Sequence, residues 1–251
     1  MTANFDLRDI QARPVAVSVP SLPAHAVPSF GAAPAYGRIA RERRFAPRPV
    51  TFYATIGKRV LDVALVMMAL PVVVPVVALL ALIVALSGGN PIYVQDRVGL
   101  GGRTFRMFKL RTMVRDADAR LAEHLASNPT ARAEWNLRQK LTHDPRITAF
   151  GSFLRRSSLD ELPQLFNVLR GDMSLVGPRP MMVTQRNQYP GTAYYRLRPG
   201  LTGPWQIGAR HLTTFADRSI FDDQYESRHG LVYDLVILLR TVRVVATGTG
   251  C

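Results

Sequence analysis

Residues 63–86 read VALVMMALPVVVPVVALLALIVAL, without a single charged or hydrogen-bonding side chain. A run of this length exceeds the roughly 18 apolar residues that indicate a membrane helix. Pro71 and Pro75 lie in its middle. Each proline removes a backbone donor and collides with the carbonyl four residues earlier, so the helix is expected to break between the two halves.

Basic residues flank the run on both sides, whereas a spanning helix usually has its Lys/Arg excess on the cytoplasmic side alone. They are Arg41, Arg43, Arg44, Arg48, Lys58 and Arg59 before it, and Arg97, Arg103, Arg106, Lys109 and Arg111 after it. Two halves of about a dozen residues would each reach about 18 Å, short of the roughly 30 Å hydrocarbon core. We therefore expect residues 51–90 to form a re-entrant hairpin that enters and leaves through one leaflet; a single through-span is the alternative. Lys58 and Arg59 are expected at the headgroups, with Asp62 one turn from Lys58 as its partner.

Composition restricts the partners of the chain. Its 32 Lys and Arg residues against 18 Asp and Glu give a net charge of +14, which favours nucleic acid, anionic lipid or phosphorylated small molecules. The apolar run and the lack of any nucleic-acid-binding motif argue against nucleic acid. One cysteine, Cys251, allows no disulfide framework and no cysteine-based zinc site.

The flanking segments differ in character. Residues 1–50 are rich in Pro, Ala and Arg and predict a disordered arm, either a solvated linker or a segment that touches anionic headgroups. Residues 91–251 predict an α+β, mainly helical domain. The elements expected in it are a β-hairpin of strands 92–98 and 104–110, helices over 115–126, 131–141 and 158–169, and a last apolar helix over 231–246. This last helix is either a core helix or an interfacial one.

Two adjacent carboxylates stand in the stretch LRRSSLDELPQLFNVLRGDMSLVGPRP, residues 154–180. One interpretation is a capping box, in which Ser158 caps a helix and Glu161 is its third residue. Acidic residues in a first turn are also favoured by the helix dipole, which would account for Asp160.

The arginines around this pair favour a second interpretation. Arg155 and Arg156 precede the carboxylates and Arg179 follows them, and guanidinium groups bind diphosphates through paired contacts. In such a field Asp160 stays ionised and can attack phosphorus. Glu161 can hold Mg²⁺, which prefers oxygen ligands and substrate phosphates. Together with the apolar run, these residues indicate phosphoryl transfer at a bilayer surface.

Four motifs carry a family resemblance: KRVLD, FRMFKLRTM, DPRITAFGSFLRRSSLDELPQLFNVLRGDMSLVGPRP and RPGLTGPWQIGAR. In this order, over roughly residues 55–250, the sequence resembles the bacterial sugar transferase family. These are monotopic polyprenyl-phosphate sugar-1-phosphate transferases, and the chain is similar to their short, ExoY-like type. The family usually has Ser before the proline that matches Pro75, where this chain has Val74.

The resemblance implies roles for individual residues. Asp160 matches the nucleophile and Glu161 the Mg²⁺ ligand, while Pro75, with Pro71 reinforcing it, matches the break of the re-entrant helix. The expected substrate-binding residues are Arg155, Arg156, Arg179, Lys109 and Arg111, with Arg179 on the nucleotide.

The resemblance also implies a reaction and a location. The aspartate would attack a UDP-sugar, release UMP and form a phosphosugar-aspartyl enzyme, from which undecaprenyl phosphate takes the sugar phosphate to initiate exopolysaccharide synthesis. Galactose and glucose are the expected sugars, and residues 91–251 would lie on the cytoplasmic face of the bacterial inner membrane, in contact with membrane lipids. The alternative is a catalytically inactive membrane-anchored scaffold, and the sequence leaves open whether the chain forms a homo-oligomer.

Overall fold

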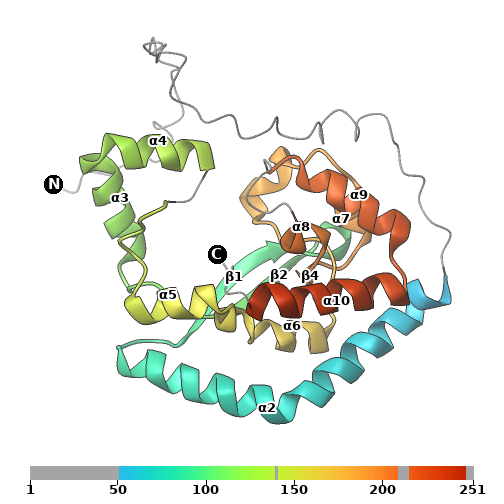
Figure 1. The fold of residues 1–251 in the computed structure, drawn as a ribbon. Helices are drawn as coiled ribbons and strands as arrows, with labels where there is room; N and C mark the ends of the chain where they lie inside the picture. The colour runs from blue at the N-terminus through green and yellow to red at the C-terminus, as the bar shows by residue number, and fades with distance from the viewer. Residues whose placement is uncertain (1–50, 139–140, 209–214, 247–251) are drawn as a thin grey trace. The chain divides into compact units, whose positions relative to one another are not determined.

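The computed structural model describes residues 51–138, 141–208 and 215–246; the predicted arm over residues 1–50 and Cys251 lie outside them. The described chain is mainly helical with two small two-stranded sheets (Figure 1), which confirms the α+β class. The elements are η2 (Tyr53–Gly57), α2 (Lys58–Leu86), β1 (Ile92–Val98), η3 (Leu100–Gly102), β2 (Thr104–Leu110), α3 (Ala117–Ser127), α4 (Pro129–Arg138), α5 (Ala149–Arg156), η4 (Leu159–Glu161), α6 (Gln164–Arg170), β3 (Ser174–Val176), η5 (Val183–Gln188), α7 (Ala193–Arg196), β4 (Gly200–Thr202), α8 (Pro204–Ile207), α9 (Arg218–Arg228) and α10 (Leu231–Ala246).

The apolar run forms one helix, α2, which continues through both prolines and bends near its middle (Figure 1). The expected pair of separate helices is therefore replaced by a single bent one. Pro71 and Pro75 are one turn apart and both exposed, so they lie on the same outer face of the helix. Proline opens the face on which it lies, which explains why α2 bends and still keeps its helical course.

The two halves of α2 pack against different core clusters. Val66 in the first half joins the first cluster with Val168 of α6 and Ile237 of α10. Leu80 and Val84 in the second half join the second cluster, completed by Leu110 and Leu154. The bend thus lets one helix contact the body at both ends.

The hairpin has the predicted strand bounds. β1 pairs antiparallel with β2, from Ile92 opposite Leu110 to Val98 opposite Thr104. Gly101 and Gly102 in the turn have φ angles of 65° and 77°, a region that glycine enters without a steric penalty. β3 and β4 form a second, parallel pair.

The predicted helices over 115–126 and 131–141 correspond to α3 and α4, and the last helix has the predicted bounds. α10 combines both expected roles. Ile237 and Asp234 are buried, whereas Val232 and Leu239 on the other face are 74% and 72% exposed. One face therefore belongs to the core and the other is an apolar surface.

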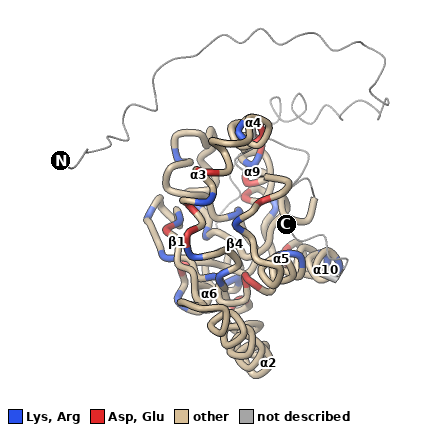
Figure 2. Tube along the Cα trace, turned by 90° about the vertical axis from the view of Figure 1, so that its left-hand side faces the viewer, with Lys and Arg blue, Asp and Glu red and all other residues tan. Residues whose placement is uncertain are grey.

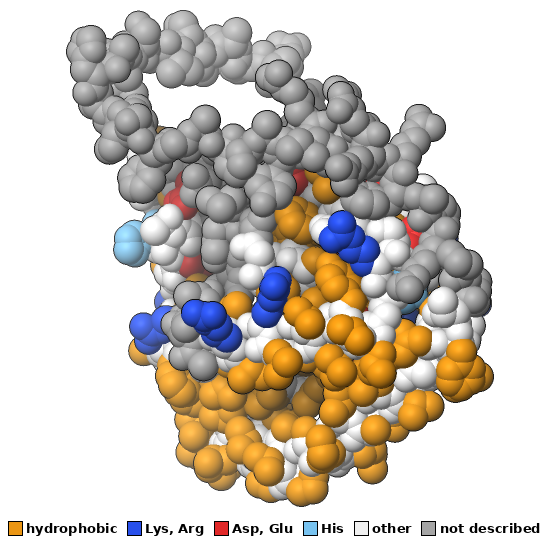
Figure 3. Space-filling view, turned by 45° about the vertical axis from the view of Figure 1, so that its right-hand side comes forward, with side chains coloured by type: hydrophobic (Ala, Val, Ile, Leu, Met, Phe, Trp, Pro, Cys, Tyr) orange, Lys and Arg blue, Asp and Glu red, His pale blue; other side chains and the backbone are white. Residues whose placement is uncertain are grey.

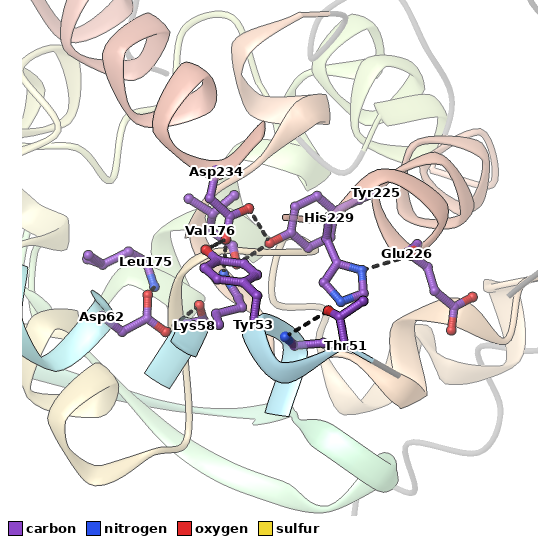
Figure 4. A network of polar contacts seen from close by, with 12 residues as sticks. Thr51, Tyr53, Lys58, Asp62, Leu175, Val176, Tyr225, Glu226, His229 and Asp234 are labelled. Atoms are coloured by element: carbon purple, nitrogen blue, oxygen red, sulfur yellow. Dashed lines mark hydrogen bonds and ion pairs between the residues drawn. The ribbon is translucent and has the colours of Figure 1, made fainter. Parts of the chain in front are cut away.

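The start of α2 is held by the carboxylate of Asp234 on α10 (Figure 4). One of its oxygens accepts hydrogen bonds from Tyr53 at 2.6 Å and Lys58 at 2.7 Å, and the other accepts one from Tyr225 at 2.7 Å. The expected pairing of Lys58 with Asp62 is wrong, because the ion pair of Lys58 is with Asp234. A carboxylate distant in sequence lies closer to the ammonium group than the one on the next turn.

Asp62 and Arg59 also bind the body. Asp62 accepts hydrogen bonds from Ser174 Oγ at 2.7 Å and the Leu175 amide at 3.1 Å. Arg59 donates to the carbonyls of Val168 and Leu169 at the end of α6. The side chains of Lys58 and Arg59 therefore both satisfy acceptors inside the protein, while their position at the headgroups stays a prediction.

A large apolar surface remains exposed along α2. Residues Tyr53–Leu86 are long and apolar enough to cross a membrane, and only 11% of their most apolar window is buried, so α2 is not a core helix. Charged residues concentrate on the body, while most of α2 carries none (Figure 2). Hydrophobic side chains cover the lower part of the molecule in Figure 3. The exposed side chains include Met67, Met68, Val72, Leu79, Leu82 and Leu86 of α2. A surface of this kind marks a membrane contact, while the re-entrant topology stays a prediction.

Replacing Asp234 tests the anchor of α2. Asp234→Asn leaves Lys58 largely buried without its counter-charge, and breaking a buried pair in this way costs about 3–5 kcal/mol. We expect the free energy of unfolding in nanodiscs to fall by that amount. Asp116→Asn, which breaks the exposed pair with Arg120, is the control and should cost much less, because exposed ion pairs contribute little to stability. Equal losses in the two variants would show that the network does not anchor α2.

Candidate active site

The two adjacent carboxylates lie in a tight turn between α5 and α6. Thr148 caps α5 by accepting a hydrogen bond from the Gly151 amide at 2.9 Å. After α5, Ser158 adopts a left-handed conformation with φ of 58°, and the chain then forms the short 3-10 helix η4. Ser158 makes no side-chain capping bond, and α6 begins only at Gln164. The predicted capping box and the continuous helix over 158–169 are therefore wrong, because Ser158 turns the chain.

Asn167 fixes α6 against β2. Its side-chain amide donates to the Arg106 carbonyl at 2.7 Å, and its oxygen accepts from the Phe108 amide at 3.1 Å. Asn167 is fully buried, so these bonds are shielded from water. They set the register between α6 and β2, and Lys109 follows Phe108 directly on the strand.

This arrangement brings four charged residues together. Lys109 Nζ lies 2.8 Å from Glu161 Oε1 and 3.8 Å from Asp160 Oδ2. Arg179 Nη2 lies 3.9 Å from the same Glu161 oxygen. The structure therefore brings together the predicted nucleophile, the predicted metal ligand and two of the predicted substrate-binding residues. Glu161, Lys109 and Arg179 line a cleft, and Asp160 lies beside Lys109. The lining of the cleft also includes Arg97, Met107, Gln164 and Leu201.

Burial changes the acidity of Asp160. The residue is 7% exposed, and Leu159 beside it packs on the second core cluster. Burial, together with the negative charge of Glu161, raises the pKa of Asp160 to about 6, against the opposing effect of Lys109 and Arg155. Asp160 is thus mostly ionised at neutral pH and close to its titration range.

The remaining predicted arginines are placed differently. Arg155 lies near Asp160 and donates through Nε to Thr112 Oγ1 at 2.8 Å. Arg111 donates to the carbonyls of Gly88 and Val84 and so caps the end of α2. Arg156 is exposed at the end of α5. Neither Arg111 nor Arg156 forms an ion pair with the two carboxylates within the part of the chain that the structure describes.

The sequence reasoning did not identify Arg97 and Arg218 as part of this region. Arg97, near the end of β1, lines the cleft, and Arg218, at the start of α9, stacks on Trp205 at 4.2 Å. In the sequence, Arg97 stands only among the basic residues that flank the apolar run, and no motif contains Arg218. Only the fold brings these distant segments together.

The two carboxylates fit a Mg²⁺ ion whose coordination the substrate phosphates would complete. In the described ranges, no group of three or more His, Cys, Asp or Glu side chains could hold a metal alone. Mg²⁺, however, is usually bound by one or two carboxylates, substrate phosphates and water. Asp160 and Glu161 supply two carboxylates, and the side chain of Glu161 is 22% exposed to the cleft.

The fold and the site define a membrane-associated class of protein. In this class, a bent apolar helix carries a small α+β body with paired carboxylates. The chain belongs to the bacterial sugar transferase family, whose model matches residues 53–248.

Three similar proteins support this assignment. The chain is 44% identical over 198 residues to the exopolysaccharide production protein ExoY of Sinorhizobium fredii, a match over 78% of this chain and 88% of the relative. It is 44% identical over 195 residues to the undecaprenyl-phosphate galactose phosphotransferase of Salmonella typhimurium, covering 77% of this chain and 41% of that protein. It is 39% identical over 210 residues to the UDP-glucose:undecaprenyl-phosphate glucose-1-phosphate transferase of Xanthomonas campestris, covering 78% of this chain and 40% of that protein.

The raised pKa of Asp160 predicts a pH-dependent stability. Asp160 has a pKa near 3.8 in the unfolded state and about 6 in the folded state, so between these pH values the folded state binds more protons. The free energy of unfolding of wild type therefore falls as pH rises through this range, by up to about 3 kcal/mol. Above this range, a further rise in pH has no effect through Asp160. Asp160→Asn removes this pH-dependent loss of stability. We expect the variant to gain stability relative to wild type as pH rises from 4 to 7 in metal-free buffer.

The measurement is urea unfolding of detergent-solubilised protein at several pH values. Asp118→Asn, at an exposed position of α3, is the control for removing a surface carboxylate. A stability difference between Asp160→Asn and wild type that stays constant from pH 4 to 7 would contradict the raised pKa.

Proposed function

We propose that this protein transfers a sugar-1-phosphate from a UDP-sugar to undecaprenyl phosphate at the cytoplasmic face of the bacterial inner membrane, and so initiates exopolysaccharide synthesis. The observation that carries the proposal is the half-shielded carboxylate pair of Asp160 and Glu161, which Lys109 bridges. The same turn packs against α2 through the second core cluster. The names of the relatives support both the acceptor and the class of reaction.

In the first step, a carboxylate oxygen of Asp160 attacks the β-phosphorus of the UDP-sugar. The bond from this phosphorus to the oxygen that bridges to the α-phosphate breaks, and UMP leaves with the electron pair. A pKa of about 6 keeps Asp160 ionised at neutral pH while leaving it more basic than an exposed aspartate. Lys109 and Arg179 lie where positive charge stabilises the phosphoryl oxygens.

In the second step, an oxygen of undecaprenyl phosphate attacks the same phosphorus. The Asp160 carboxylate is the leaving group and is regenerated, and the product is undecaprenyl-diphosphate-sugar. Glu161 would hold Mg²⁺, which when bound neutralises charge on the phosphate oxygens. The exposed apolar faces of α2 and α10 keep the site at the level of the lipid acceptor.

The sugar is either galactose or glucose in this proposal. The Salmonella relative is named for galactose and the Xanthomonas relative for glucose, and the chain is similar to both over comparable lengths. A panel of UDP-sugars is therefore part of the experiment.

UMP release tests the proposed reaction. Protein in nanodiscs is incubated with Mg²⁺, undecaprenyl phosphate and each UDP-sugar in turn. We expect release with UDP-galactose or UDP-glucose, and a loss of at least about a thousandfold in Asp160→Asn, because the variant lacks the nucleophile. Asp116→Asn, at an exposed position directly before α3, should retain full activity.

The scaffold alternative predicts a different result. Folded wild-type protein that releases no UMP with any sugar would favour it. Full turnover in Asp160→Asn would refute the nucleophile. With radiolabelled UDP-sugar and no acceptor, wild type should retain label on the protein after denaturation and Asp160→Asn should not.

A further inference from the structure

Three arginines from distant parts of the chain gather beside the cleft, and two of them, Arg97 and Arg179, line it. Arg179 and Arg218 both lie over the ring of Trp205, with their guanidinium carbons 5.8 Å and 4.2 Å from its centre. Arg97 donates through Nη1 to the carbonyl of Pro180 at 3.1 Å, directly beside Arg179, and lines the same cleft. We call Arg97, Arg179 and Arg218 the arginine cluster.

The positive charges of the arginine cluster are poorly balanced. Within the described ranges, Arg97 and Arg218 form no ion pair, and Arg179 reaches only Glu161, at 3.9 Å. That carboxylate is already bound by Lys109 at 2.8 Å. Among the described residues, the buried Nε groups of Arg97 and Arg218 have no hydrogen-bond partner, an arrangement that costs free energy unless a ligand compensates it.

The surrounding groups do not remove this excess of charge. Burial and the neighbouring Arg179 lower the pKa of Arg97 and of Arg218 to about 10, so both remain charged at neutral pH. Asp222 is the acidic residue that most affects Arg218. Its carboxylate, however, accepts a hydrogen bond from Tyr189 at 2.7 Å and forms no ion pair with Arg218.

We propose that the arginine cluster binds the α-phosphate of the nucleotide half of the donor, with Arg97 and Arg218 as binding residues in addition to Arg179. This inference rests on the proposed function. Guanidinium groups are well suited to phosphate, because their planar forks donate two parallel hydrogen bonds.

The position of the cluster favours the nucleotide over the lipid phosphate. Arg218 and Trp205 belong to α9 and α8, which Figure 1 shows on the side of α10 away from α2. The lipid phosphate has to stay near the apolar surface of α2, whereas a soluble nucleotide can approach from water. The ligand class is therefore a nucleoside 5′-phosphate.

The cluster would also assist the leaving group. Glu161 contacts both Lys109 and Arg179, so a diphosphate can place its β-phosphorus at Asp160 and its α-phosphate at the arginines. When the bridging bond breaks, negative charge develops on the α-phosphate oxygen. Arginines fixed beside that oxygen stabilise the departing UMP more strongly than the bound donor.

Binding of UMP tests the inference without any turnover. The chain has two tryptophans, Trp135 and Trp205, so Trp135→Phe leaves Trp205 as the only indole reporter. We expect UMP to change Trp205 fluorescence in nanodisc-embedded protein, and uridine to bind at least about tenfold more weakly, because it lacks the phosphate.

The variants are compared by calorimetric titration with UMP. We expect Arg218→Gln to raise the Kd for UMP by at least about tenfold, because a charge-assisted hydrogen bond is lost. Arg218→Lys keeps the charge but not the planar fork and should fall between wild type and Arg218→Gln. Arg120→Gln on α3, an exposed arginine paired with Asp116, is the matched control and should bind like wild type.

Three results would overturn the inference. They are equal affinities for UMP and uridine in wild type, an unchanged Kd in folded Arg218→Gln, and a Trp205 response to farnesyl phosphate but not to UMP. The first and third use protein without a change in the cluster, so they decide the question even if Arg218→Gln does not fold.

The outcome is separable from that of the proposed function. In an Asp160→Asn background the nucleophile is absent, and the effect of Arg218→Gln on UMP binding should persist. UMP binding at the cluster without turnover of any UDP-sugar by wild type would leave the subsite in place and remove the proposed reaction. Turnover of a UDP-sugar without UMP binding that depends on the arginine cluster would support the proposed reaction and remove the subsite.

Discussion

The carboxylate of Asp234 is the constraint on which the rest of the structure depends. It is fully buried and receives Lys58 and Tyr53 from the start of the apolar helix and Tyr225 from α9. A buried carboxylate without partners is costly, so the three segments must meet at this point. Tyr225 also donates to the Val176 carbonyl at 3.2 Å, which ties the same network to β3.

β3 carries this constraint to the cleft. Asp62 holds Ser174 and Leu175, and the strand ends three residues before Arg179. There Gly177 and Gly200 approach so closely that a Cβ on Gly200 would lie 2.1 Å from the Gly177 nitrogen. The position of Arg179 thus depends on the anchor of the membrane helix. In this way the apolar segment is both a membrane contact and part of the support of the site.

The second half of α2 acts on the carboxylates from the other side. Leu80 and Val84 belong to the cluster on which Leu159 packs, and burial raises the pKa of the neighbouring Asp160. An exposed aspartate at the same position in sequence would be a weaker base. Apolar burial therefore makes the carboxylate in the site more basic, and the nearby basic side chains limit this rise in its pKa.

Particular elements show why some features could be predicted and others could not. The hairpin followed from β-prone runs around Gly101 and Gly102, and α10 from its apolar pattern, because both depend on local sequence. The helix expected over 158–169 was wrong because the left-handed turn at Ser158 has no sequence signal in a residue other than glycine. Lys58 was given the wrong partner because Asp234 is distant in the chain.

The sequence by itself determined the apolar helix, the hairpin and the adjacent carboxylates among arginines, since each is a pattern of neighbouring residues. Only the tertiary structure decided which charges meet. It brought Lys109 to Asp160 and Glu161, left Arg111 and Arg156 away from them, and added Arg97 and Arg218 around Trp205. The physical reason is that ion pairs and clefts depend on distances in space, which the packing of α2 and α6 sets and which spacing along the chain does not.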